Sequence, residues 1–216
     1  MKLLSRAALG LAISASVAEA QLSIMIGDND GYGFGVADDG IGVVWPGPGS
    51  SGSDYDGRSL AEMAAVNGAA ITDVYSALHP CCGPNAFSVG SVSFPVLGDI
   101  VSGSLTVDMA DFEASVFGPF LVSFNGVVQP WLFNFDDGFR NTVVRSFVLD
   151  AATIASINAA NAFTVTIDRN GSDDFVAFDY FQLDARLSAV PEPSTWGLTG
   201  IGLAVGALAL RRRRAV

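Results

Sequence analysis

The chain has 216 residues, half of them hydrophobic, and a formal net charge of −11 at pH 7. Residues 21–190 hold 20 acidic residues and five arginines, a net charge of −15, and the only lysine of the chain, Lys2, precedes them. So acidic a segment repels nucleic acid and anionic membranes, which are poor partners, and attracts divalent cations. It is also rich in Phe, Val, Ile and Leu, which excludes a disordered acidic tail.

The first 20 residues are typical of an export signal. Lys2 and Arg6 give a positive start, residues 7–17 are an apolar run, and Ala18 and Ala20 form a small-x-small cleavage site. We therefore expect a signal peptide over 1–20 and a mature chain that begins at Gln21. An ordinary N-terminal core helix is the alternative.

Residues 21–90 predict a strand, then loops, then short elements. The strand begins at Leu22 and leads into a Gly/Asp loop with Gly31, Gly33 and Gly35, which lacks the helix that a nucleotide-binding fingerprint needs. Ser59 and Glu62 form a capping box that predicts a two-turn helix. Residues 71–78 fit either a helix or a strand, and the β-rich surroundings favour a strand.

Two turns carry oxygen ligands suited to calcium. Asp28, Asn29 and Asp30 offer two carboxylates and an amide oxygen in flexible backbone, although the spacing does not match an EF-hand loop. Asp168, Asn170, Asp173 and Asp174 are a similar case. Asx-rich turns of this kind are also common without any metal, and calcium is the only cofactor that the sequence suggests.

The rare reactive residues of the chain gather in one turn. His79, the only histidine, lies next to Pro80 and the adjacent pair Cys81 and Cys82. The two cysteines predict a vicinal disulfide, with two free thiols or intermolecular bonds as alternatives. Neighbours in sequence rarely point at each other, so we do not expect a catalytic Cys-His dyad. Loop aromatics could stack on sugars or be buried: Trp45, Tyr55, Trp131 and Phe139.

Residues 90–187 predict an all-β region. Apolar and polar residues alternate over 101–109 and 120–124, and Asn125-Gly126 predicts a hairpin turn. Strands are also expected near 142–149 and 162–168, on either side of a short helix over 151–159 that Asp150 caps. The last strand, 174–187, begins with apolar residues at both odd and even positions, so we expect a central strand covered on both faces.

The last 27 residues combine three features. Pro191-Glu192-Pro193 holds the chain extended, Trp196 to Leu210 is uncharged, and Arg211, Arg212, Arg213 and Arg214 follow. As a helix, the uncharged stretch spans about 22 Å, short of the hydrocarbon core of about 30 Å, and local thinning can close the gap. We therefore expect a marginal transmembrane helix with its arginines on the cytoplasmic side.

This order of features resembles the PEP-CTERM sorting signal of Gram-negative bacteria. The same tail is also labelled ice-binding protein C-terminal domain, a label that is not evidence of ice binding. The resemblance implies that an exosortase, an integral-membrane cysteine protease, recognises Pro191-Glu192-Pro193 and removes the tail. The protein is then released or passed to the cell surface, often in species that make exopolysaccharide. A membrane anchor that is never cut is the alternative.

The exported block, residues 21–189, predicts a mainly-β sandwich or jelly roll with one or two short helices. Its strand, Ala-rich helix, strand, turn and final strand resemble the C-terminal half of galactose-binding-like β-sandwiches. We expect a non-enzymatic surface or matrix protein that binds polysaccharide or serves a structural role. The alternative is a secreted glycan-active enzyme with an unrecognised carboxylate pair among its 20 acids.

Overall fold

The computed structural model describes residues 20–35, 37, 41–44, 55–75, 88–129, 135–138 and 141–188, with the side chains of 41–44 and Tyr55 excepted. Residues 20–188 form one compact unit. Several predicted features lie outside the described residues: the signal peptide, His79, Cys81, Cys82, Trp45, Trp131, Phe139 and the tail 190–216. Within the described ranges, no helix is both long enough and apolar enough to cross a membrane.

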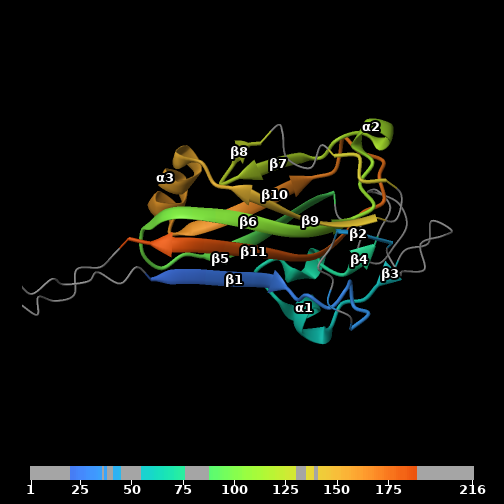
Figure 1. Ribbon diagram of the computed structural model, residues 1–216, viewed down its shortest axis with the longest axis horizontal. Coiled ribbons are helices and arrows are strands. Elements are labelled where there is room, and N and C mark those ends of the chain that lie inside the picture. The colour runs from blue at the N-terminus through green and yellow to red at the C-terminus, as the bar shows by residue number, and fades with distance from the viewer. Residues whose placement is uncertain are drawn as a thin grey trace, which may run out of the picture. The chain divides into compact units, whose positions relative to one another are not determined.

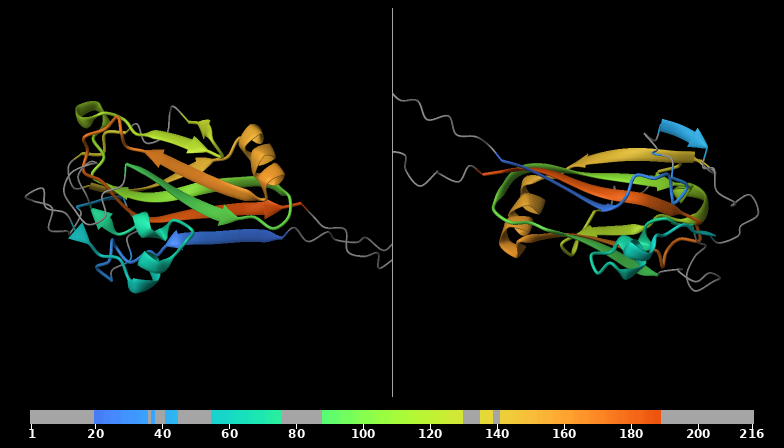
Figure 2. Two further views of the ribbon diagram at one scale, coloured as in Figure 1. Left: turned by 180° about the vertical axis from the view of Figure 1, so that it is seen from behind. Right: turned by 90° about the horizontal axis from the view of Figure 1, so that it is seen from below.

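Two antiparallel sheets form a sandwich, which confirms the mainly-β fold (Figures 1 and 2). The five-stranded sheet has the order β1 (Gln21–Gly27), β11 (Ala177–Leu187), β6 (Ile100–Ala110), β9 (Asn141–Val148) and β2 (Ile41–Val44). The four-stranded sheet has the order β5 (Val89–Pro95), β10 (Ala162–Asp168), β7 (Leu121–Phe124) and β8 (Val127–Val128). A separate pair joins β3 (Tyr55–Asp56) and β4 (Val74–Tyr75).

The core lies between the two sheets and is built from alternate residues of each strand. Leu105 and Val107 of β6 face Phe163 and Val165 of β10, and all four are fully buried. Ile157 of α3 (Ala151–Ala160) closes one end of the core.

The period-2 pattern of the sequence correctly separates inner from outer residues over 104–107. It fails at Val101, which is 54% exposed where the register shifts near Ile100, and at Asp108, which is fully buried.

The local signals in the sequence form the predicted elements. Asn125 and Gly126 take positive φ angles of 46° and 81° and join β7 to β8 in the expected hairpin. The Thr153 N–H donates to Asp150 Oδ1 at 2.7 Å, which caps α3. Ser59 and Glu62 form the predicted capping box at the start of α1 (Leu60–Ala64).

The strand predicted for 71–78 is largely replaced, within its described part, by turns. The 3₁₀ helix η2 (Ala69–Ile71) covers its start, and β4 is only two residues long. The reason is tertiary, since Asp73 takes a left-handed φ of 55° and its N–H donates to the Phe178 carbonyl of β11 at 2.7 Å. The chain turns towards the large sheet here and does not run alongside it.

The last strand, β11, is central, as predicted, and lies between β1 and β6. A bulge between Phe178 and Phe181 divides it. Before the bulge its second face is covered by a small cluster that includes Tyr32 and Tyr75. After the bulge the outer face is polar and carries Gln182 and Asp184. Both faces are thus covered only over the first half of the strand.

Candidate functional site

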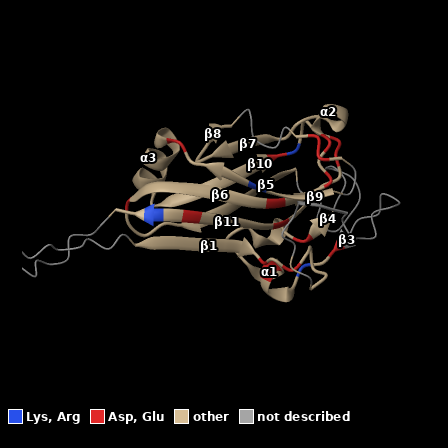
Figure 3. Cartoon of the chain, in the orientation of Figure 1, with Lys and Arg blue, Asp and Glu red and all other residues tan. Residues whose placement is uncertain are grey.

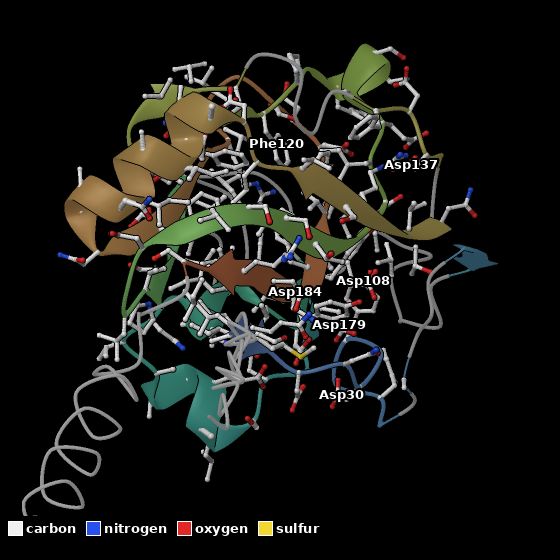
Figure 4. The ribbon with its side chains drawn as sticks, turned by 60° about the vertical axis from the view of Figure 1, so that its left-hand side comes forward. Asp30, Asp108, Phe120, Asp137, Asp179 and Asp184 are labelled. Atoms are coloured by element: carbon white, nitrogen blue, oxygen red, sulfur yellow. The ribbon has the colours of Figure 1, made fainter. Side chains whose placement is uncertain are left out.

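Four aspartates from three separate parts of the chain meet at one end of the sandwich. Asp28 and Asp30 lie in the loop after β1, Asp73 lies between η2 and β4, and Asp179 lies at the bulge of β11 (Figure 4 labels Asp30 and Asp179). One carboxylate oxygen from each lies within 4.8 Å of the others. We refer to these four residues as the acidic cluster. Two of them, Asp28 and Asp30, are the residues that the sequence singles out as calcium ligands.

The close approach of three backbone segments brings the cluster together. Gly27 pairs with Tyr180, so the loop after β1 begins beside Asp179. Gly27 has a φ of 79°, and a Cβ at this position would meet the Asp179 carbonyl and lie 2.8 Å from Thr72 Cγ2. Only glycine fits here without a shift of the backbone. Its small size lets β1, β11 and the segment before β4 meet at one point.

Backbone donors orient two of the carboxylates. Tyr32 N–H donates to Asp179 Oδ1 at 2.8 Å, and Gly31 N–H donates to Asp179 Oδ2 at 3.2 Å. Gly33 N–H donates to Asp30 Oδ1 at 2.5 Å. Tyr32 is itself fully buried, and its hydroxyl donates to Asp108 Oδ1 at 2.9 Å, which fixes the loop against β6. The loop therefore presents its carboxylates from a rigid frame.

Asp73 differs from the other three because no donor reaches either of its buried carboxylate oxygens, and the groups beside them are the carboxylates of Glu62 and Asp179. Its side chain is 0% exposed. Burial, followed by the negative charges of Glu62 and Asp179, raises the pKa of Asp73 well above its usual range. Burial also raises the pKa of Asp179, against the two backbone hydrogen bonds that lower it.

The surroundings of the cluster add negative charge. Glu62, in the capping box of α1, accepts from the Thr72 hydroxyl at 3.0 Å and lies near Asp73. The guanidinium of Arg58 binds other groups: it pairs with Asp56 at 2.9 Å and donates to the Ala70 carbonyl at 2.8 Å. Such a concentration of carboxylates suits a hard, oxygen-preferring cation.

The other predicted calcium turn has a different structure. Asp168 Oδ1 accepts from the N–H and the side-chain amide of Asn170, at 2.9 and 2.7 Å, which is the local bonding of an Asx turn. Asp174 is buried and accepts from Glu113 N–H at 2.8 Å, whereas Asp173 is exposed. Among the described residues, these side chains do not form a ligand cluster.

The outer face of the five-stranded sheet is a second candidate site. It carries two rows of polar side chains: Ser23, Asp184 and Ser104 in one row, and Gln182, Thr106 and Ser146 in the next. We call these six residues the polar face. Asp184 accepts from the Ser23 hydroxyl at 2.6 Å and from the Gln182 amide at 2.9 Å. A shallow hollow of about 470 Å³ lies over Ser23, Ser104 and Asp184.

The chain enters and leaves the folded unit at one place. Leu187 N–H donates to the Ala20 carbonyl at 2.9 Å, and Ser188 N–H donates to the Asp99 carbonyl at 2.7 Å. The expected signal-cleavage site therefore borders the first residue of β1, and Pro191 follows the last residue of β11 by four positions. The acidic cluster lies at the other end of β1, and Figure 3 shows most of the acidic residues toward that end.

Asp73 and Asp179 are the site residues that sequence reasoning does not find. Both share one signal, a single carboxylate within an apolar stretch: "AAITDVY" around Asp73 and "FVAFDYF" around Asp179. A buried acid is rare unless it has a partner. A search for isolated acids in apolar runs would therefore have added both residues to the candidates.

Three solved structures resemble the chain weakly. Latent PorU from Porphyromonas gingivalis is 12% identical with a TM-score of 0.35, over 83% of this chain and 14% of that one. The K1 cleaved adhesin domain of Lys-gingipain from Porphyromonas gingivalis W83 is 13% identical with a TM-score of 0.34, over 78% and 99%. The ANX1 ectodomain from Arabidopsis thaliana is 12% identical with a TM-score of 0.30, over 73% and 43%. At these scores the likenesses carry no inference about function.

No protein of curated function matches the chain. A family model does match the tail, over residues 189–214, and it describes the PEP-CTERM protein-sorting motif. The match begins at the residue after the folded unit ends and includes Pro191-Glu192-Pro193 and the four arginines. The chain is therefore an exported protein that carries a β-sandwich and, directly behind it, a PEP-CTERM protein-sorting motif.

Proposed function

We propose that this protein is a non-enzymatic component of the cell surface or extracellular matrix, released when an exosortase cuts its tail. The observation that carries the proposal is the sorting motif at 189–214, which begins only where the folded unit has ended. Cleavage at Pro191-Glu192-Pro193 would leave every described strand and helix in the released product. The β-sandwich is thus the part that acts outside the cell.

The two neighbouring chain ends support presentation at a surface. Ala20 and Leu187 lie side by side, so a tether on either end leaves the domain from the same place. The seven residues of β1 separate that place from the acidic cluster, a distance of about 23 Å at about 3.3 Å per residue. A tethered domain would therefore offer the far end and the sheet faces to other molecules.

Within this role, the polar face is the surface that we assign to polysaccharide. Hydroxyl, amide and carboxylate groups stand there in rows on neighbouring strands, which lie about 4.8 Å apart. Such groups exchange hydrogen bonds with sugar hydroxyls. Because residues 21–190 carry a net charge of −15, we expect neutral polysaccharides to bind in preference to acidic ones.

The geometry of the acidic cluster favours binding over glycan hydrolysis. A glycosidase needs two carboxyl groups that flank a sugar, about 5 to 9.5 Å apart. The cluster carboxylates are closer than this, and Asp73 and Asp179 are 0% exposed, so neither can reach a sugar ring. Incubation with polysaccharide should release no new reducing ends; their appearance would support the alternative of a secreted enzyme.

Cell fractionation tests the sorting proposal. Changing Pro191, Glu192 and Pro193 to alanine should leave uncut protein in the inner membrane, because the protease loses its recognition motif. The variant S194A/T195A is the matched control in the same tail and should be released like the wild type. Release of the triple variant at the wild-type size would show that no cut is made at this motif.

Glycan binding tests the assignment of the polar face. The variant Q182A/D184A removes the hydrogen-bonded centre of this face and should lower binding to neutral polysaccharides at least tenfold. The control S91A/T166A removes a similar cross-strand hydroxyl pair, 2.9 Å apart, from the outer face of the other sheet. Equal losses in both variants, or no binding by the wild type, would leave only a structural role.

A further inference from the structure

We propose that Asp28, Asp30, Asp73 and Asp179 bind one calcium ion, which joins the loop after β1 and the segment before β4 to the central strand β11. In sequence, Asp28 and Asp30 lie near the start of the folded unit, Asp179 lies near its end, and Asp73 lies between them. A bound ion would therefore cross-link parts of the chain that are far apart in sequence. This inference is independent of the polysaccharide assignment, which concerns a different surface.

The strongest single observation is Asp73. Its side chain is 0% exposed, neither carboxylate oxygen accepts a hydrogen bond from the described residues, and its side-chain neighbours are the carboxylates of Glu62 and Asp179. An ionised carboxylate buried without a partner is strongly destabilising, and a coordinated cation is one of the few groups that compensate for it. Asp73 is also held in place, since its N–H donates to the Phe178 carbonyl and its carbonyl accepts from Gly57 N–H at 2.8 Å.

The spacing of the oxygens fits one calcium ion. The four ligand atoms lie within 4.8 Å of one another. Two oxygens on opposite sides of a calcium ion are about 4.6 to 5.2 Å apart, since each bond is about 2.3 to 2.6 Å, so a cluster of this width accommodates calcium. All four side chains are oxygen donors, which disfavours zinc and copper.

The surrounding hydrogen bonds leave the cluster free to bind an ion. Asp179 receives two backbone N–H groups and Asp30 receives one, and each carboxylate keeps lone pairs for a metal. Asp28 is exposed at the edge of the cluster and gives an ion a way in. Further ligands, up to the six to eight that calcium takes, would be water or backbone carbonyls.

A single shared proton is the competing occupant, and substitution distinguishes the two. A proton neutralises one carboxylate of the four, whereas a divalent ion offsets two charges and contacts all of the side chains. Replacement of Asp73 by asparagine keeps its shape and removes its charge. Without calcium, D73N should therefore be at least as stable as the wild type, and it should lose most of the response to calcium.

The experiment uses the processed protein purified from the producing cells, stripped with EDTA and dialysed. Titration with calcium chloride, followed by calorimetry, should show one site per molecule. At a calcium concentration 100 times the dissociation constant, the Tm should rise by about 5 to 10 °C. Magnesium chloride at the same concentration should give a much smaller rise.

Two further variants, D28N and D184N, complete the test. D28N alters only the exposed ligand, so it should fold normally and bind calcium at least tenfold more weakly; it serves if D73N fails to fold. D184N, on the same strand β11 but in the polar face, should keep the full response. The proposal is overturned if the wild type binds no calcium, or if D28N and D184N respond equally.

Discussion

At the residue scale, Asp174 is a buried acid outside the acidic cluster, in a different environment. It is 2% exposed and accepts from Glu113 N–H at 2.8 Å, while its own carbonyl accepts from the Arg169 guanidinium at 2.9 Å. Burial raises the pKa of Asp174 to about 7, helped by the nearby charges of Asp111 and Glu113. The folded state therefore holds this proton more tightly than the unfolded state does.

This difference predicts a pH-dependent effect of D174N. The contribution of Asp174 to stability is fully present below its ordinary pKa of 3.8 and is lost as the pH rises through about 7. Asparagine stays neutral and can still accept from Glu113 N–H. Relative to the wild type, D174N should thus gain up to about 4 kcal/mol between pH 4 and pH 8.

Urea unfolding at both pH values measures this gain. The exposed neighbour Asp173 provides the control, and D173N should change the free energy of unfolding less than D174N does. An identical effect of D174N at the two pH values would contradict a raised pKa for Asp174 in the folded protein.

At the element scale, one side chain reinforces the backbone pairing that holds the β7–β8 hairpin to β10. Asn125 Oδ1 accepts from Thr164 N–H at 2.8 Å. The side-chain amide of Asn125 donates to the Ala162 carbonyl and to the Ser156 hydroxyl, both at 3.1 Å. Asn125 thus forms the turn, extends the contact with β10 and touches α3.

Loss of this side chain should be costly for a turn residue. We expect N125A to lower the free energy of unfolding by about 2 to 4 kcal/mol, because it removes three hydrogen bonds and places alanine at a positive φ. S156A removes only one of these bonds and should cost about 1 kcal/mol or less. Equal losses in the two variants, measured by urea unfolding, would mean that the bonds to β10 contribute nothing.

Elements with a local cause could be predicted from the sequence, and elements with a tertiary cause could not. The hairpin, the α3 cap at Asp150 and the capping box at Ser59 depend on residues within a few positions of one another. By contrast, the short strand β4 depends on the bond from Asp73 to Phe178, which lies on β11. The acidic cluster divides in the same way, because Asp28 and Asp30 are neighbours, whereas Asp73 and Asp179 join them only through the fold.

At the scale of the whole molecule, the strand pairing continues to the C-terminal end of the folded unit. Leu183 is fully buried and pairs with Ile24 of β1 and Leu105 of β6, and Arg186 pairs with Gln21. The end of β11 therefore holds both of its neighbours in the sheet, and on the C-terminal side the unit ends at Ser188.

Two truncations test this boundary. A chain of residues 21–188 should unfold at the same Tm as the processed protein, because it keeps every described element. A chain of residues 21–182 loses the second half of β11, with its pairing to β1 and β6 and the buried side chains of Leu183 and Ala185. We expect this cost to exceed a typical domain stability of about 5 to 15 kcal/mol. Circular dichroism should show that the shorter chain is unfolded; a cooperative transition would place the boundary earlier.

The position of β11 also sets when the protein can fold. The first strand of the sheet must wait for the last, since β1 pairs along its whole length with β11. Contacts so distant in sequence make folding slow, on the order of milliseconds to seconds. Export begins with the N-terminus, so during translocation β1 has no partner and the large sheet cannot close. The sandwich can therefore close only after β11, which lies just ahead of the sorting motif, has been exported.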